Sequence, residues 1–143
     1  MEDDTIKLLR ECNAGIKMGV TSLDEVMDHV KSESMKTLLK ESKNTHEKLG
    51  NLTHEYLNAY QDEGKEPGTM AKMMSWMKTN IKMGEENSDR TAADLVTDGC
   101  NMGVKSLYKY LHQYKAADKE IKDLAKQLIS AEEKLAADLR EYL

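Results

Sequence analysis

Apolar residues recur at alternating intervals of three and four along the first part of the chain, from about residue 4 to residue 30. This spacing places them on one face of a helix and predicts a coiled-coil-like seam. Asn13 falls on the seam, where a buried amide commonly fixes register and pairing. The seam consists of Ile6, Leu9, Asn13, Ile16, Val20, Leu23, Met27 and Val30.

Three further segments share this helical pattern. Residues 32–34, Ser-Glu-Ser, interrupt the first helix, and a serine there can cap a second helix from about 35 to 60. The stretch QDEGKEPGT, with two glycines and Pro67, ends the second helix. A third helix is expected from about 89 to 114, followed by a turn at 116–118 and a fourth helix that reaches Tyr142. The chain is therefore predicted to be all-α.

Two sequence matches indicate an internal repeat. MGVTSL at 18–23 recurs as MGVKSL at 102–107, and EKLGNLTHEYL at 47–57 recurs as EKLAADLREYL at 133–143. The offsets are 84 and 86 residues, so the copies, about 4–60 and 89–143, differ by a two-residue insertion. A single helical hairpin cannot bury its apolar stripe, whereas two hairpins packed together can. We expect one domain over residues 1–143.

The connection between the predicted hairpins is long. Short turns make the helices of each hairpin antiparallel, whereas residues 61–88 are numerous enough to travel the length of a bundle. Helices two and three can then run parallel, which is the ferritin-like arrangement of a four-helix bundle. The predicted architecture is two helical hairpins joined by a long crossover that carries a short amphipathic helix.

Composition and charge narrow the function classes. The chain has 39% hydrophobic and 33% charged residues, one proline and no phenylalanine, which is typical of a helical protein. A net charge of −5 argues against nucleic acid as a partner.

Cys12 and Cys100 are far apart and form no CxxC pair, which suits free thiols in a reducing compartment. The acidic start of the chain has no apolar signal-peptide run, and no stretch has membrane-spanning length, so we expect a cytoplasmic protein without a transmembrane segment.

Four features of the sequence are distinctive: EGKEPGT at 63–69, Trp76 with Lys78 nearby, ECNAG at 11–15 and DGCNMG at 98–103. They resemble motifs of a bacterial family of ferritin-like four-helix bundles of unknown function. The resemblance covers nearly the whole chain. It implies the bundle fold and no particular activity. Ferritins and rubrerythrins are more distant relatives of that family and use the same bundle for di-iron chemistry.

The ligand pattern of a di-iron centre is not met. Such a centre takes a Glu from each of two helices and a Glu-x-x-His from each of the other two. His46 and His54 have lysine and asparagine three residues before them, and the fourth predicted helix has no histidine. We expect no metal, no cofactor and no catalytic residue. The mid-bundle positions, where ligands would lie, are instead predicted to form an apolar layer near Ile16, Leu49 to Leu52, Cys100 and Leu135.

His46 and Glu132 are repeat equivalents on helices two and four, 86 residues apart. Two arrangements are open for them: separate places at a partly solvated edge, or a pair that faces across the bundle as a polar contact or half a metal site. Cys12 and Cys100 are expected to be buried small hydrophobes, or redox-active if exposed. Tyr56 and Tyr142 are also repeat equivalents, and we expect them to pack near the bundle ends.

The stretch GTMAKMMSWMKTNIKMG at 68–84 contains five of the ten methionines and the only tryptophan. Its apolar residues share one helical face, with Lys72, Lys78 and Lys82 on the other side. The face can cover the core, bind a second copy or another partner, or contact a membrane surface or a soft metal. As an interaction surface it would comprise Met70, Met73, Met74, Trp76, Met77 and Ile81.

No nucleophile with a matching base and no glycine-rich phosphate loop is present in the sequence. The sequence therefore favours a non-catalytic ferritin-like bundle that serves as a structural or interaction module and forms a homo-oligomer, a dimer above all. The alternative is a divergent ferritin-like protein that binds iron or manganese for redox chemistry or storage.

Overall fold

The computed structural model describes residues 2–60, 62 and 88–143 of the chain. Four α-helices and a terminal 3-10 turn account for nearly all of these residues, and no strand occurs among them. The prediction of an all-α fold is therefore confirmed. The elements are α1 (Glu2–Met27), α2 (Glu33–Ala59), α4 (Ser88–Gln113), α5 (Lys119–Asp138) and the 3-10 helix η2 (Leu139–Tyr142).

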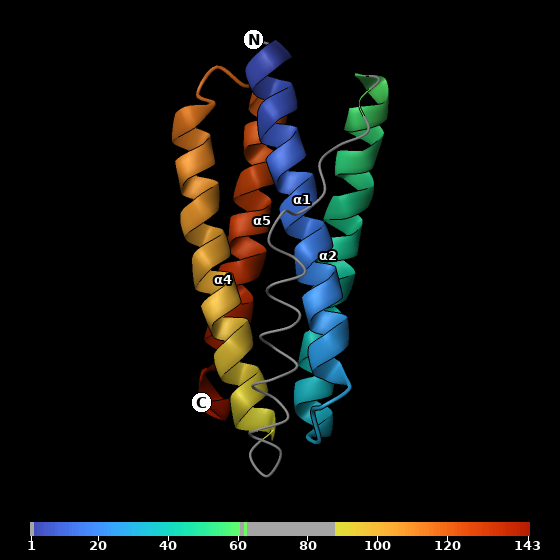
Figure 1. Cartoon of the computed structure of the whole chain (residues 1–143), viewed down its shortest axis with the longest axis vertical. Helices are drawn as coiled ribbons and strands as arrows, with labels where there is room; N and C mark the ends of the chain where they lie inside the picture. Colours follow the sequence, from blue (N-terminus) through green and yellow to red (C-terminus); the bar gives the residue numbers. More distant parts are fainter. Residues whose placement is uncertain (1, 61, 63–87) are drawn as a thin grey trace.

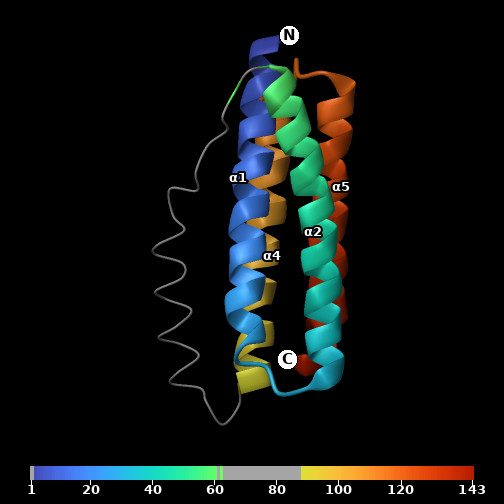
Figure 2. The same cartoon turned by 90° about the vertical axis from the view of Figure 1, so that its right-hand side faces the viewer.

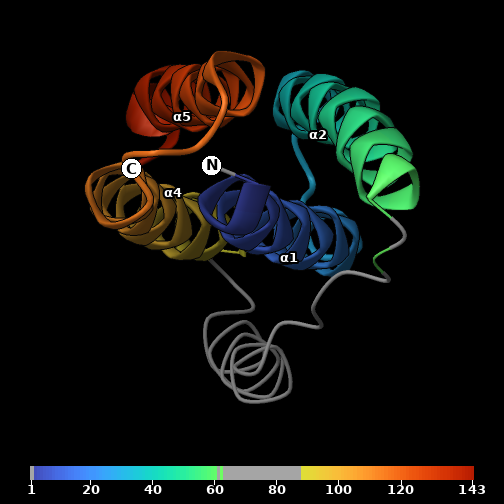
Figure 3. The same cartoon turned by 90° about the horizontal axis from the view of Figure 1, so that it is seen from above.

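The four helices lie side by side along one long axis (Figure 1). Helices α1 and α5 run in one direction and α2 and α4 in the other. Seen from above, α1 neighbours α2 and α4, while α5 completes the square next to the same two helices (Figure 3). Every pair of adjacent helices is consequently antiparallel, and the parallel pairs are diagonal. The chain leaves α2 at one end of the bundle and enters α4 at the other.

The start of α2 follows local capping chemistry. Ser32 has extended backbone angles, and its side-chain oxygen accepts a hydrogen bond from the backbone N–H of Met35 at 3.2 Å. The predicted cap of the second helix is therefore confirmed. Each predicted α-helix agrees with the structure to within a few residues at either end, the last being completed by η2. The predicted amphipathic helix of the crossover lies outside the described residues.

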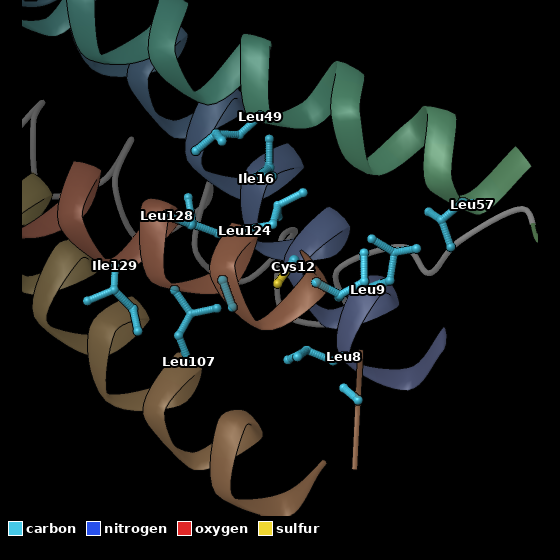
Figure 4. Packing of buried hydrophobic residues seen from close by; sticks show 13 residues of the cluster. Leu8, Leu9, Cys12, Ile16, Leu49, Leu57, Leu107, Leu124, Leu128 and Ile129 are labelled. Carbon is cyan, nitrogen blue, oxygen red and sulfur yellow. The ribbon is translucent and has the colours of Figure 1, made fainter. Parts of the chain in front are cut away.

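The core consists of two clusters at opposite ends of the bundle. The cluster nearest the N-terminus, here called the N-end cluster, is shown in Figure 4. The C-end cluster lies at the other end, where η2 packs on α4 and α5. The N-end cluster comprises Leu8, Leu9, Cys12, Ile16, Leu49, Leu57, Leu107, Ala117, Ile121, Leu124, Ala125, Leu128 and Ile129. The C-end cluster comprises Leu23, Val26, Val30, Met35, Leu39, Ala92, Ala93, Leu95, Val96, Cys100, Leu135 and Leu139.

The turn of each hairpin is held by the first turn of the other hairpin. At the lower end of Figure 2, the α1–α2 connection donates to Asp89, with Lys31 N–H at 2.6 Å and Ser32 N–H at 3.1 Å. At the opposite end, the backbone N–H of Asp118 donates to Thr5 Oγ1 at 2.8 Å. These bonds satisfy backbone donors where the helices begin, and they tie the two hairpins together at both ends.

None of the helices within the described ranges has an apolar run long enough to cross a bilayer.

Candidate functional site

His46 of α2 and Glu132 of α5 meet inside the bundle. His46 Nε2 lies 3.9 Å from Glu132 Oε1, and the two side chains are only 2% and 12% exposed. Of the two arrangements that the sequence left open, the structure shows the facing pair, and the solvated edge is wrong. The distance is that of an ion pair and is too long for a hydrogen bond.

The other ring nitrogen of His46 fixes the orientation of the imidazole. His46 Nδ1 lies 2.8 Å from the backbone carbonyl oxygen of Ser42, one helical turn earlier on α2. Because a carbonyl oxygen can only accept, Nδ1 carries a proton and donates it. Nε2 is therefore the nitrogen that turns toward α5. In a neutral imidazole of this tautomer, Nε2 presents a lone pair to the carboxylate.

Two glycines on the neighbouring helices make room for the pair. A Cβ placed on Gly19 of α1 would lie 3.1 Å from His46 Cδ2, and one on Gly103 of α4 would lie 2.9 Å from Glu132 Cδ. Glycine inside a helix costs about 1 kcal/mol relative to alanine, so two such glycines need a reason. Here the reason is the close approach of one partner's side chain to each glycine.

Sequence reasoning missed the part played by these glycines. Both were visible as the G of MGVTSL and MGVKSL, the clearest match of the predicted repeat. Gly15 and Gly99 are also repeat equivalents, yet a Cβ at either meets nothing within 4 Å, so the repeat alone does not show which glycines pack closely. The partner side chains could not be named without the arrangement of the helices.

The pKa values of both groups are raised, each for a different reason. Burial on its own lowers the pKa of His46, but the Glu132 carboxylate and the Ser42 carbonyl together raise it above the usual value. Burial raises the pKa of Glu132, and the interaction with His46 only partly offsets this. Both groups therefore hold their protons more tightly than they would in water.

The charge of Glu132 acts on two cysteines, Cys12 of α1 and Cys100 of α4, which belong to the two helices that do not carry the pair. Burial, with the negative charges of Glu11 and Glu132, raises the pKa of Cys12 to about 12. Burial and the charge of Glu132 raise the pKa of Cys100 to about 12 as well. Both cysteines are buried free thiols. They agree with the expected small hydrophobes, since a protonated buried thiol is a poor nucleophile.

One oxygen of Glu132 is buried without a hydrogen-bond donor among the described residues. Glu132 Oε2 is buried and has no partner within the part of the chain that the structure describes. An unpartnered buried oxygen is costly when it carries negative charge. The cost is smaller when the carboxyl is protonated or faces an imidazolium. The geometry therefore favours the presence of a proton on one of the two groups.

The donor set does not fit a di-metal centre. Among the described residues, no group of three or more His, Cys, Asp or Glu side chains is placed to hold a metal ion. One imidazole and one carboxylate are far fewer than the six protein ligands of that centre. The described residues around the pair therefore do not form such a centre.

The predicted apolar mid-bundle layer needs correction. Ile16, Leu49, Cys100 and Leu135 are buried, as expected, but Leu52 is 41% exposed because it lies three residues beyond Leu49, on the edge of the α2 face. The layer is also not wholly apolar. The His46–Glu132 pair lies one helical turn before Leu49 and Leu135. Helical phase, rather than height in the bundle, decides which residue points inward.

The structure also locates the other residues that were singled out from the sequence. Asn13 is buried, and its Oδ1 lies 3.0 Å from Thr53 Oγ1, so the predicted seam amide joins α1 to α2. Tyr56 and Tyr142 pack against opposite core clusters, as expected. His54 is exposed. The predicted interaction surface from Met70 to Ile81 lies outside the described residues.

A groove follows the seam between α2 and α5, over the buried pair. Its walls include Thr45 and Ala131, the sequence neighbours of His46 and Glu132. Asp123, Lys126 and Lys134 of α5 supply charge to the lining. The groove is a shallow surface feature that brings water close to the seam.

No protein-family model, curated protein or solved structure matches this chain. The resemblance to a ferritin-like family therefore rests on the sequence motifs already given.

Proposed function

We propose that the chain is a non-catalytic ferritin-like bundle that acts as a structural or interaction module, in the form of a homo-oligomer and most simply a dimer. The observation that supports this proposal is the composition of the bundle interior among the described residues. Its ionisable centre is one buried His–Glu pair between two apolar clusters.

The chemistry of the His46–Glu132 pair favours a structural role over a catalytic one. A reacting group needs access to a substrate, but His46 is 2% exposed, and its Nδ1 is occupied by Ser42. Both nearby thiols are protonated at neutral pH because their pKa values are about 12. The described part of the chain therefore offers its outer surface, rather than its interior, for interaction with other molecules.

Native mass spectrometry would test both parts of the proposal. The full chain would be loaded anaerobically with ferrous and manganous ions and then desalted, so that one spectrum gives the subunit number and the bound metal. We expect a dimer without stoichiometric metal. One or two tightly held ions per chain would support the alternative, a divergent ferritin-like protein for metal storage or redox chemistry.

The surface for association is proposed from sequence alone. The double variant Met73→Glu, Met77→Glu would place two charges on the predicted Met-rich face and should give a folded monomer. The matched control is Lys72→Gln, Lys78→Gln, which changes the net charge by the same amount on the predicted polar side. A dimer that survives the methionine changes would argue against this surface.

A further inference from the structure

The His46–Glu132 pair connects the two hairpins at the middle of the bundle. His46 belongs to the α1–α2 hairpin and Glu132 to the α4–α5 hairpin, with Gly19 and Gly103 behind them. All four helices therefore meet around these two side chains. Any change in the charge of the pair acts directly on the α2–α5 seam.

The fully deprotonated pair would bring two acceptors together. With Nδ1–H directed at Ser42, a neutral His46 offers only the Nε2 lone pair to the Glu132 carboxylate, 3.9 Å away. Glu132 Oε2 adds a second buried acceptor that has no donor in the described ranges. A positive group must lie between them if the arrangement is to be favourable.

A proton fits this place better than a metal ion. A structural zinc ion takes four ligands, and the described residues supply no third His, Cys, Asp or Glu ligand to this pair. A proton needs no further ligand. It makes the pair either imidazolium with carboxylate or neutral imidazole with carboxylic acid.

We infer that the His46–Glu132 pair is a proton-dependent contact between the two hairpins, and that loss of its proton as the pH rises loosens the α2–α5 seam. The proton-free pair leaves a buried carboxylate opposite a lone pair. Water then becomes the best partner for Glu132, and a groove lined by Thr45 and Ala131 lies along the same α2–α5 seam. This pH response goes beyond the proposed function as a structural or interaction module.

Among the described residues, the titratable and charged groups near the pair come from α1, α4 and α5. On α1 and α4, Cys12 and Cys100 face the charge of Glu132, and their pKa values of about 12 keep both thiols neutral. On α2, the neighbour of His46 is the uncharged Ser42. On α5, the charged groups of the groove are Asp123, Lys126 and Lys134, at its surface.

The direction of the pH effect follows from the raised pKa of His46. A proton held more tightly in the folded state stabilises that state below the unfolded pKa of about 6.5. The stabilisation disappears as the pH rises through the folded pKa of His46. The raised pKa of Glu132 has the same effect at lower pH. Stability falls as the pH rises from the pKa of this carboxyl in the unfolded state toward its higher pKa in the folded state. Stability should therefore fall as the pH rises above about 6.5.

The experiment compares urea unfolding of the full chain at several pH values from 6 to 9. The folding constant of the wild type should fall by up to about tenfold per pH unit while the pair loses its proton. Glu132→Gln should remove this dependence, since its amide can donate to a neutral His46. The matched control is His54→Gln on the exposed face of α2, which should keep the wild-type dependence.

A second measurement on the wild type keeps the test independent of how the variants fold. NMR titration of the imidazole signals should give His46 a pKa above 6.5, and Glu132→Gln should lower it. A wild-type pKa at or below 6.5 would overturn the inference, as would equal pH dependence in the wild type and Glu132→Gln. Zinc ions that raise the urea midpoint of the wild type but not of Glu132→Gln would overturn it in favour of a metal site.

Discussion

The two ends of the bundle are built from corresponding positions with different residues. Leu8 and Leu9 of the N-end cluster lie 84 residues before Ala92 and Ala93 of the C-end cluster. On the second helix of each hairpin the sizes are reversed, because Leu39 of the C-end cluster lies 86 residues before Ala125 of the N-end cluster. Each end therefore combines large and small residues, although on different helices. Cores tolerate such exchange when total volume is conserved.

The middle of the bundle differs from the two ends in how the repeat-equivalent residues of the two hairpins are related. Gly19 and Gly103 are identical, but the side chains that they accommodate, His46 and Glu132, are complementary in charge. In a symmetric pair of identical hairpins, the same residue would face itself at this point. Two non-identical hairpins in one chain allow a base to face an acid.

The largest expected effect comes from breaking the central pair on one side. His46→Leu should lower the free energy of unfolding at pH 7 by about 4 kcal/mol, because it leaves Glu132 buried without its partner. The double variant His46→Leu, Glu132→Leu replaces the pair with apolar groups and should lie within about 1.5 kcal/mol of the wild type. Urea unfolding followed by circular dichroism measures both. A double variant as unstable as the single variant would show that the pair itself stabilises the fold.

A smaller effect is expected when the two ends are made alike. Leu9→Ala copies the residue at position 93 into the N-end cluster and should cost about 3 kcal/mol, since Leu9 is fully buried and the change leaves a cavity. Leu52→Ala removes the same atoms from a residue that is 41% exposed, and should cost less than about 1 kcal/mol. Thermal and urea unfolding would compare the two. Equal losses would contradict the assignment of Leu9 to the core.

The smallest expected effects on stability come from replacing the two glycines beside the pair, Gly19 and Gly103, with alanine. Gly103→Ala should destabilise by about 1 kcal/mol net, because a Cβ 2.9 Å from Glu132 Cδ outweighs the better helix propensity of alanine. Gly19→Ala should be close to neutral, since its Cβ lies 3.1 Å from His46 Cδ2 and a small shift of the ring relieves the contact.

Gly99→Ala is the matched control for the glycine variants. A Cβ at Gly99 meets nothing within 4 Å, so the change should stabilise α4 by about 0.5–1 kcal/mol through helix propensity. Unfolding midpoints of the three variants should follow the order Gly99, Gly19, Gly103 from most to least stable. A stabilised Gly103→Ala would show that Glu132 moves freely beside α4.

Apolar periodicity was enough to locate the four helices, because a helix that is amphipathic along its length has few alternatives. It also placed Asn13 on the seam of the first helix, while the interruption at 32–34 gave the cap of the second helix and the internal repeat paired His46 with Glu132 as equivalent positions. The burial of that pair, the exposure of Leu52 and the purpose of Gly19 and Gly103 did not follow from the pattern. These depend on how far each helix is rotated toward its neighbours, and a rotation of one residue exchanges an edge position for an interior one. Packing between helices sets that rotation, so the chemistry of the interior emerged only when α1, α2, α4 and α5 were brought together.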